Sequence, residues 1–365
     1  MSRNRRFTLA ASLLGAATLL STSAGLAHAG AGDPLRGDQW GLDQVRAEQA
    51  WPTSTGTGAV VAVVDTGVDL THPDLKANLV PGATFTDCGK AGGPCGNGDF
   101  RGPDGQNNGD EHGTHVAGIV AAVAGNGTGV AGVAPNAGIM PVKVLEEGSG
   151  TFEDIAAGIR WAVDHGADVI NMSLGGLAGT QVLTITGLES SVTEAIAYAN
   201  AQGTSVIVAA GNSATPACNT PAWEPGAICV ASTDRNELKS WFSELPNKPD
   251  LKAVAAPGGA GLLSCEDDIV STVPVGTGSA ACGQKDYDYY AGTSMATPHV
   301  AGVAALLFAQ GRTLSNVEDA LLDTARQPGT GLTGVYSPAY GWGVVDAAAA
   351  VKSAGATTGN SRKKH

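Results

Sequence analysis

The chain is short of positive charge. It contains 21 lysine and arginine residues against 34 aspartate and glutamate residues, which gives a formal charge of −13. Proteins that hold nucleic acid need basic grooves that neutralise phosphates. The sequence therefore argues against a nucleic-acid partner, and the acidic balance mainly favours solubility.

Long apolar runs are missing after the first 29 residues. Residues 1–29 combine three arginines, a mostly apolar run at 7–20 and the cleavage-site pattern Ala27-His28-Ala29, which is typical of a secretory signal peptide. A membrane anchor is the weaker interpretation, because serine and threonine residues interrupt the run. We therefore expect a secreted, extracellular protein with no membrane span. Removing the three arginines takes the formal charge from −13 to −16.

The sequence also lacks any C-x-x-C spacing, which disfavours a metal cluster built on its cysteines. An even number of cysteines in an exported chain favours disulfides instead, although six cysteines allow fifteen connectivities. We expect the local pairing, because each pair would close a short loop. The expected disulfides are Cys88–Cys95, Cys218–Cys229 and Cys265–Cys282.

Aromatic residues are few, at 5%, whereas glycine is abundant, with 52 residues. Small residues suit tight turns and close packing of helices on a sheet. Apolar residues make up 43% of the chain and recur periodically, which excludes a disordered protein. The length suits one large α/β domain or two ordinary domains.

Apolar, β-branched runs alternate with helical patterns. The run at 58–64 predicts a strand buried on both faces, and further strands are expected at 139–145, 168–172 and 206–210. Helices are expected near 110–122 and after three capping-box-like signals, which are Thr151-x-x-Asp154, Ser191-x-x-Glu194 (through 201) and Ser315-x-x-Glu318 (through 325).

This alternation predicts an α/β fold of three layers, in which helices flank a mostly parallel central sheet. We expect a single catalytic domain over residues 30–355. An N-terminal segment around Trp40 and residues 47–51 should pack on it, and a disordered basic tail should follow at 356–365.

Three side chains at the ends of predicted elements can together make an activated serine. Asp65 follows the first strand, His112 lies near the start of a helix, and Ser294 precedes an apolar helical series. Serine needs an imidazole to take its proton, and the imidazole needs a carboxylate to fix its tautomer. Asn212, at the end of another strand, can donate to an oxyanion. Taken alone, the Ser294 stretch is more simply explained as a helix N-cap.

Four short segments carry a stronger signal together than apart. They are VVDTGV at 63–68, HGTHVAG at 112–118, AAGN at 209–212 and GTSMATP at 292–298. In this order they resemble the aspartate, histidine, oxyanion-asparagine and serine motifs of the subtilisin-like serine peptidases, the subtilases, whose triad order is Asp, His, Ser. The resemblance covers roughly residues 40–350.

The resemblance implies a serine endopeptidase that hydrolyses extended polypeptides through an acyl-enzyme. Asp65 would orient His112, which acts as base and then acid, while Ser294 attacks and Asn212 binds the oxyanion. Activity should be highest at neutral to alkaline pH, where His112 is neutral. The segment implied to pair with the substrate backbone and to wall its first pocket is Ser173-Leu174-Gly175-Gly176.

The family resemblance implies no cofactor for the chemistry but a structural Ca²⁺ ion. Asp74, the Asn126 side chain and the Thr128 carbonyl match the family's ligands in part. The loop at 123–130 is one residue longer than the common pattern, and a plain glycine-rich turn is an equal alternative. Protein or peptide substrates and a monomeric state are expected. Many secreted subtilases carry a folding-assisting prodomain, whereas here about ten residues separate Ala29 from Trp40.

Two other functions stay open at this point. An esterase or lipase is disfavoured, because Ser294 lies in G-x-S-x-A rather than G-x-S-x-G and the triad order differs. A binding protein with an inactive site is the second alternative. Other titratable residues near the motifs are weaker candidates. Asp69 and Asp74 do not end the apolar strand, His72 precedes Pro73 in a loop, His115 is interpreted as structural, and His299 is interpreted as a helix residue. The pocket floor is expected in the loop at 214–227, which does not define the substrate.

Overall fold

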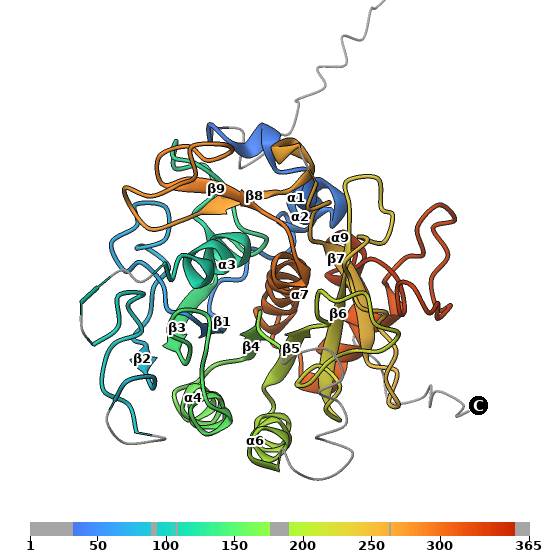
Figure 1. The fold of residues 1–365 in the computed structure, drawn as a ribbon. Helices are drawn as coiled ribbons and strands as arrows, with labels where there is room; N and C mark the ends of the chain where they lie inside the picture. Colours follow the sequence, from blue (N-terminus) through green and yellow to red (C-terminus); the bar gives the residue numbers. More distant parts are fainter. Residues whose placement is uncertain are drawn as a thin grey trace, which may run out of the picture.

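The computed structural model describes residues 32–88, 93–103, 105–106, 109–175, 190–262 and 264–354. The signal peptide predicted at 1–29 and the tail predicted at 356–365 lie outside these residues, so both stay predictions. Within the described residues, a seven-stranded sheet lies between two groups of helices (Figure 1). This is the three-layer α/β architecture that the sequence predicts.

The central sheet has the strand order β2-β3-β1-β4-β5-β6-β7, and all neighbouring strands run parallel. The carboxyl ends of its strands therefore lie along one edge, where open α/β sheets place their sites. The strands are β1 (Val60–Asp65), β2 (Ala83–Thr84), β3 (Gly138–Lys143), β4 (Val169–Met172), β5 (Ser205–Ala209), β6 (Ala227–Thr233) and β7 (Ala253–Pro257). A separate antiparallel pair is formed by β8 (Ile269–Thr272) and β9 (Tyr287–Tyr290).

Helices cover both faces of the sheet. The α-helices are α1 (Trp40–Gln44), α2 (Ala47–Ala50), α3 (His112–Ala121), α4 (Phe152–Asp164), α6 (Ser190–Ala201), α7 (Thr293–Phe308), α8 (Leu314–Asp323) and α9 (Ala347–Ala350). Two short 3₁₀ helices are η1 (Arg36–Asp38) and η2 (Cys265–Asp267).

Alternate side chains of β1 enter two different cores. Val61 and Val63 share a core with α3 and α7, whereas Ala62 and Val64 share a core with α4 and α6. Figure 1 shows the two pairs of helices on opposite sides of the strands. The continuous β-branched run of β1 thus follows from burial on both faces.

Two of the three helix starts predicted from capping-box-like signals are confirmed, and one is wrong. Thr151 caps α4 and accepts from Asp154 N, as predicted, and α6 begins within one residue of its predicted start. The prediction that Ser315 opens the helix expected through residue 325 is wrong, because Thr313 is the N-cap of α8 and accepts from Asn316 N, and the helix α9 that follows was not predicted. Thr313 and Ser315 are both residue types that can cap a helix. Thr313, whose backbone is extended, takes the N-cap position.

The three disulfides are the local pairs that the sequence predicts, Cys88–Cys95, Cys218–Cys229 and Cys265–Cys282. Cys218 and Cys229 are fully buried, and their bond ties the loop after β5 to strand β6. Cross-links of this kind stabilise a fold mainly by restricting the unfolded chain.

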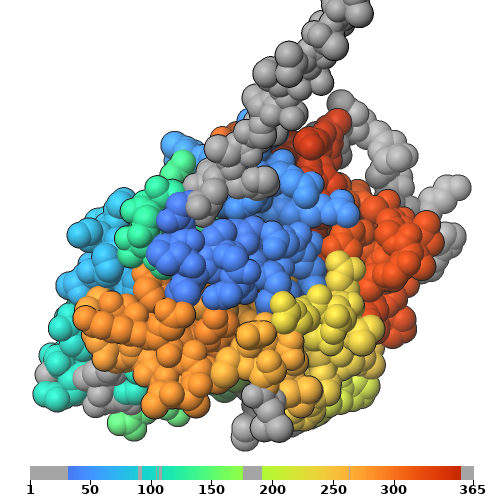
Figure 2. All heavy atoms as spheres, turned by 90° about the horizontal axis from the view of Figure 1, so that it is seen from above, coloured from blue at the N-terminus to red at the C-terminus, as the bar shows by residue number. Residues whose placement is uncertain are grey.

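The N-terminal segment packs on the domain, as predicted. Trp40 Nε1 donates to Asp268 O at 3.1 Å, and Arg46 forms an ion pair with Asp346 at 2.8 Å. Figure 2 shows this part of the chain (blue) between residues near 270–290 (orange) and the C-terminal part (red).

Candidate active site

Asp65 and His112 meet at the carboxyl edge of the sheet. Asp65 is the last residue of β1 and is fully buried, and His112 is the first residue of α3. His112 Nδ1 donates to Asp65 Oδ1 at 2.8 Å, and Thr66 N donates to the same oxygen at 2.7 Å. With its proton on Nδ1, the neutral imidazole presents Nε2 as a free base.

Two opposing effects set the pKa of His112. Burial lowers it, whereas the charge and hydrogen bond of Asp65, and more weakly the charge of Asp110, raise it. The net result is a pKa above the ordinary value of 6.5. The side chain is still 33% exposed, so it can reach a substrate.

A buried lysine that sequence reasoning missed ties this site together. Lys143 is fully buried at the end of β3, in register with Asp65. Its Nζ donates to Thr66 O at 2.8 Å, to Asp110 Oδ2 at 2.8 Å and to Leu145 O at 2.9 Å. Lys143 thereby joins the turn after Asp65, the segment before His112 and the loop after β3. Its position in an apolar strand gave no signal of this contact.

Ser294 is the second residue of α7, and Gly292 rather than Ser294 is the N-cap. Ser294 Oγ donates to Ser173 O at 3.1 Å, and Ser173 Oγ donates to Ser294 O at 2.7 Å. The Ser294 carbonyl can accept this bond because Pro298, four residues later, has no N–H to offer it. Within the described part of the chain, no hydrogen bond joins Ser294 to His112.

Asn212 lies beside the start of α7. Its Oδ1 accepts from Thr293 N at 2.9 Å and from Thr293 Oγ1 at 3.0 Å, which turns Nδ2 away from Thr293. A Cβ placed on Gly292 would lie 3.5 Å from Asn212 Nδ2 and 3.6 Å from Ser294 N. The side-chain donor of Asn212 and the backbone donor of Ser294 therefore flank one small space.

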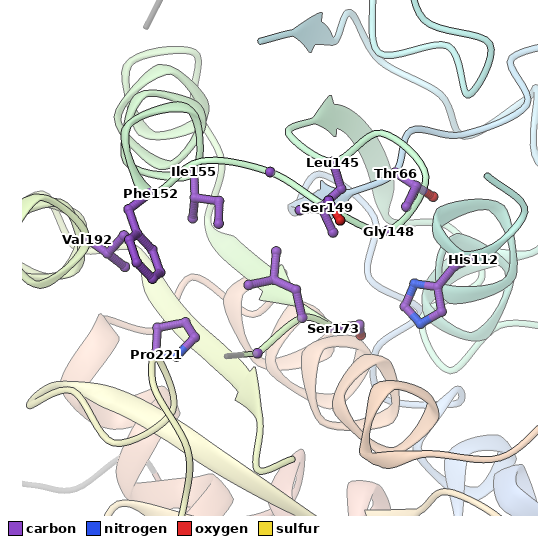
Figure 3. Close-up of a pocket in the computed structure, with 13 residues that line it drawn as sticks. Thr66, His112, Leu145, Gly148, Ser149, Phe152, Ile155, Ser173, Val192 and Pro221 are labelled. Carbon is purple, nitrogen blue, oxygen red and sulfur yellow. The ribbon is translucent and has the colours of Figure 1, made fainter. Parts of the chain in front are cut away.

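A cavity of about 510 Å³ opens beside His112 (Figure 3). Of the predicted substrate segment, Ser173, Leu174 and Gly175 line it, whereas Gly176 lies outside the described residues. Sequence reasoning missed the facing loop and the apolar end of the cavity. These further lining residues include Leu145, Gly148, Ser149, Gly150, Phe152, Ile155, Val192 and Pro221. Gly148 and Gly150, on either side of Ser149, were the sequence signal that could have predicted this loop.

The competing histidines are structural. His115 Nε2 pairs with Asp288 O at 3.1 Å, and its ring stacks on Tyr290. His299 Nδ1 pairs with Met295 O at 2.8 Å. Burial lowers the pKa of His115 to about 3 and that of His299 to about 4, so both are neutral wherever His112 titrates.

The remaining competing residues also have structural partners. His72 Nε2 pairs with Asp286 O at 3.1 Å. Asp69 Oδ1 accepts from Thr71 N at 2.8 Å, and its Oδ2 accepts from Val275 N at 2.8 Å. These contacts tie surface loops together and leave Asp65 as the carboxylate that faces His112.

The predicted metal ligands lie together. Asn126 Nδ2 donates to Asp74 Oδ1 at 2.7 Å, and Thr128 N donates to Asn126 Oδ1 at 2.7 Å. Asp33, which sequence reasoning missed, accepts from Gly125 N at 2.7 Å on the same loop. Burial raises the pKa of Asp74 to about 6, and the Asp33 charge contributes to the rise. No cluster of three His, Cys, Asp or Glu side chains occurs in the described segments, so a cation here would also need amide and carbonyl oxygens.

Comparisons with known proteins identify the family of this chain. The model of the subtilase family matches residues 56–343. Thermitase of Thermoactinomyces vulgaris is 44% identical over 295 residues, which cover 80% of this chain and 90% of thermitase. Subtilisin E of Bacillus subtilis strain 168 is 37% identical over 321 residues, which cover 86% and 71%.

Solved structures give the same result. A protease from Pseudoalteromonas arctica is 38% identical, with a TM-score of 0.72, over 88% of this chain and 98% of that protein. Family, relatives and fold thus agree over most of the chain. The chain belongs to the subtilase family and is a serine endopeptidase.

Proposed function

We propose that Asp65, His112 and Ser294 form the catalytic triad of a secreted endopeptidase. The observation that carries this proposal is the 2.8 Å bond from His112 Nδ1 to Asp65 Oδ1, which leaves Nε2 free to take a proton on a residue that lines the cavity (Figure 3). Ser294 supports it through Ser173, whose carbonyl accepts from Ser294 Oγ and which lines the same cavity as His112.

The proposed reaction begins when the Ser294 hydroxyl leaves the Ser173 carbonyl and turns toward His112. Catalytic hydrogen bonds are often absent or long before substrate binds. His112 Nε2 takes the proton as Ser294 Oγ attacks the scissile carbonyl, and Asp65 stabilises the imidazolium. His112 then gives the proton to the leaving amine. A water molecule hydrolyses the acyl-enzyme by the same route.

We propose that the substrate binds as an extended strand. The edge at Ser173–Gly175 and the loop at Gly148–Gly150 lie on the walls of one cavity, and a peptide between them can pair with backbone groups on both sides (Figure 3). Phe152, Ile155 and Leu174 give the cavity an apolar end that fits an apolar side chain.

The proposal that the protein is secreted has two supports, the signal-peptide pattern and the disulfides. Residues 1–29 have the pattern of a signal peptide, and disulfides such as the three present here persist in oxidising compartments. Within the described residues, no helix is long and apolar enough to cross a membrane.

Fluorophosphonate labelling beside casein digestion tests the function. We expect one labelled serine, Ser294, together with casein cleavage. Labelling without casein cleavage would instead support a narrow processing enzyme or an esterase. A folded protein that takes no label would show that the triad is not assembled, as in a binding protein with an inactive site.

Asn212 is proposed to bind the oxyanion together with Ser294 N. Replacing it with alanine should lower kcat by about 10²–10³, a range known from subtilisin itself, and should leave KM nearly unchanged. Steady-state kinetics on a chromogenic peptide would measure this. Asn236→Ala, which changes an exposed asparagine in a surface turn, serves as the control. A fall in kcat no larger than that of the control would contradict the role.

We also propose that the loop at 123–130 helps to bind a structural Ca²⁺. Two carboxylates, Asp33 and Asp74, face this loop, and burial together with the charge of Asp33 raises the pKa of Asp74. Carboxylate, amide and carbonyl oxygens are the ligands that Ca²⁺ prefers. Asp33, Asp74, Asn126 and the Thr128 carbonyl would hold the ion, whose charge would stabilise the folded loop.

Removing calcium should therefore lower thermal stability. A site filled at 100 times its Kd adds about 2.7 kcal/mol, so for a domain of this size EDTA should lower the unfolding midpoint by about 4 °C. Differential scanning calorimetry with and without EDTA measures the change. In Asp74→Asn the EDTA effect should disappear, whereas an equal drop in both proteins would place the ion elsewhere.

A further inference from the structure

A buried carboxylate outside the triad lies under the loop that carries Asn212. Glu244 is fully buried between β6 and β7. Its Oε1 accepts from Ser213 N at 3.1 Å and from Asn219 Nδ2 at 3.0 Å, and its Oε2 accepts from Thr215 N. No lysine or arginine forms a salt bridge with it among the described residues. Three N–H donors thus compensate the burial of this charge directly, and the charge of Lys239 acts on it without a salt bridge.

The backbone of the loop is shaped around this carboxylate. Ala214 lies between two of the donors, Ser213 N and Thr215 N, and has a φ of 55°. Left-handed backbone is unusual for alanine, and it makes successive N–H groups converge on one anion. Because Ala214 is exposed, solvent-side packing does not hold this conformation. Ala214 N donates to Phe242 O at 2.8 Å, and the carboxylate below accepts from the N–H groups on either side of Ala214.

Glu244 also holds the other side of Asn212. Its backbone N donates to Gly211 O at 3.1 Å. A Cβ on Gly211 would lie 2.8 Å from Glu244 Cγ, so the close approach depends on glycine. Glu244 therefore contacts both neighbours of Asn212 in the sequence, Gly211 and Ser213, while Thr293 Oγ1 also accepts from Gly211 N at 3.2 Å.

Asn212 is exposed, and the side-chain bonds described for it go to Thr293 through Oδ1. These two bonds orient the amide relative to Thr293, whereas the place from which Nδ2 is offered also depends on the position of the backbone on either side. An oxyanion donor stabilises a transition state only when it is already in place, and a small misplacement is costly.

We propose that Glu244 is a positioning residue for the oxyanion hole. Its carboxylate holds the loop from Ser213 to Asn219, and thereby the place from which Asn212 offers Nδ2. The inference rests on the oxyanion role proposed above for Asn212. Glu244 touches neither the substrate nor the triad, so it acts through Asn212.

Glu244→Gln gives the test, because a glutamine Nε2 cannot accept from Thr215 N. We expect kcat to fall by about tenfold to a hundredfold with KM nearly unchanged. In an Asn212→Ala background the same change should cost no more than about twofold, because the group it positions is gone. A purely structural residue would lower activity by the same factor in both backgrounds.

The matched control is Glu318→Gln. It neutralises a buried carboxylate on α8, away from the site, that pairs with Lys252. It should leave kcat unchanged. Circular dichroism and thermal unfolding would establish that each variant is folded. If Glu244→Gln does not fold, Asn219→Ala removes one donor to the intact carboxylate and carries the same double-mutant cycle.

Equal losses in both backgrounds, or an unchanged kcat in folded Glu244→Gln, would overturn the inference while Asn212 keeps its role. An unchanged kcat in Asn212→Ala alone would overturn the oxyanion role itself, and the inference with it. If Glu244→Gln lowers kcat in the wild-type background but not in the Asn212→Ala background, the result supports both the positioning role of Glu244 and the oxyanion role of Asn212.

Discussion

Ser294→Ala should lower kcat by about 10⁶, the loss known from the equivalent change in subtilisin itself. The hydroxyl is the only group the substitution removes. Its hydrogen bond goes to Ser173 O, and the side chain is half-buried, so the fold should persist. Hydrolysis of a chromogenic peptide and fluorophosphonate labelling would both measure the loss.

The control for this variant is Ser353→Ala, a half-buried serine near the C-terminal end of the described chain. It should retain full activity and full labelling. A folded Ser294→Ala enzyme that still takes up the label would show that another serine is the nucleophile. Loss of folding in Ser294→Ala would show instead that the bond to Ser173 is needed for stability.

Asp65→Asn should lower kcat by about 10⁴, because an amide no longer selects the tautomer with its proton on Nδ1. It should also move the pH profile. Asp65 raises the pKa of His112 against the effect of burial, so the wild-type enzyme should gain activity as pH rises through a value above 6.5. Without the carboxylate, burial dominates and the pKa of His112 falls.

The acidic limb of kcat/KM should therefore shift to lower pH in Asp65→Asn, although activity is low throughout. Steady-state rates between about pH 4 and pH 9 would measure this shift. The pKa values of His115 and His299 are about 3 and 4, so the titration of these two side chains does not account for a limb near or above pH 6.5. Asp69→Asn is the matched control, and an unmoved limb in Asp65→Asn would show that His112 is not the titrating base.

Prediction from the sequence worked where the physical cause is local. The run that becomes β1 is continuous and β-branched, and Thr151 with Asp154 forms a local cap. It worked less well where two local choices compete, as with Thr313 and Ser315 before α8. Strands β6 and β7 were missed, because their pairing partners and burial come from distant parts of the chain.

The sequence determined the order and chemistry of Asp65, His112, Asn212 and Ser294, because short motifs encode them together with the strand and helix ends on which they lie. Only the tertiary structure decided what holds these groups. Lys143 reaches Asp110 from another strand, and Glu244 reaches the Asn212 loop from the segment before β7. Such contacts depend on the packing of segments far apart in the chain, and no local pattern of residues records which buried charge faces which loop.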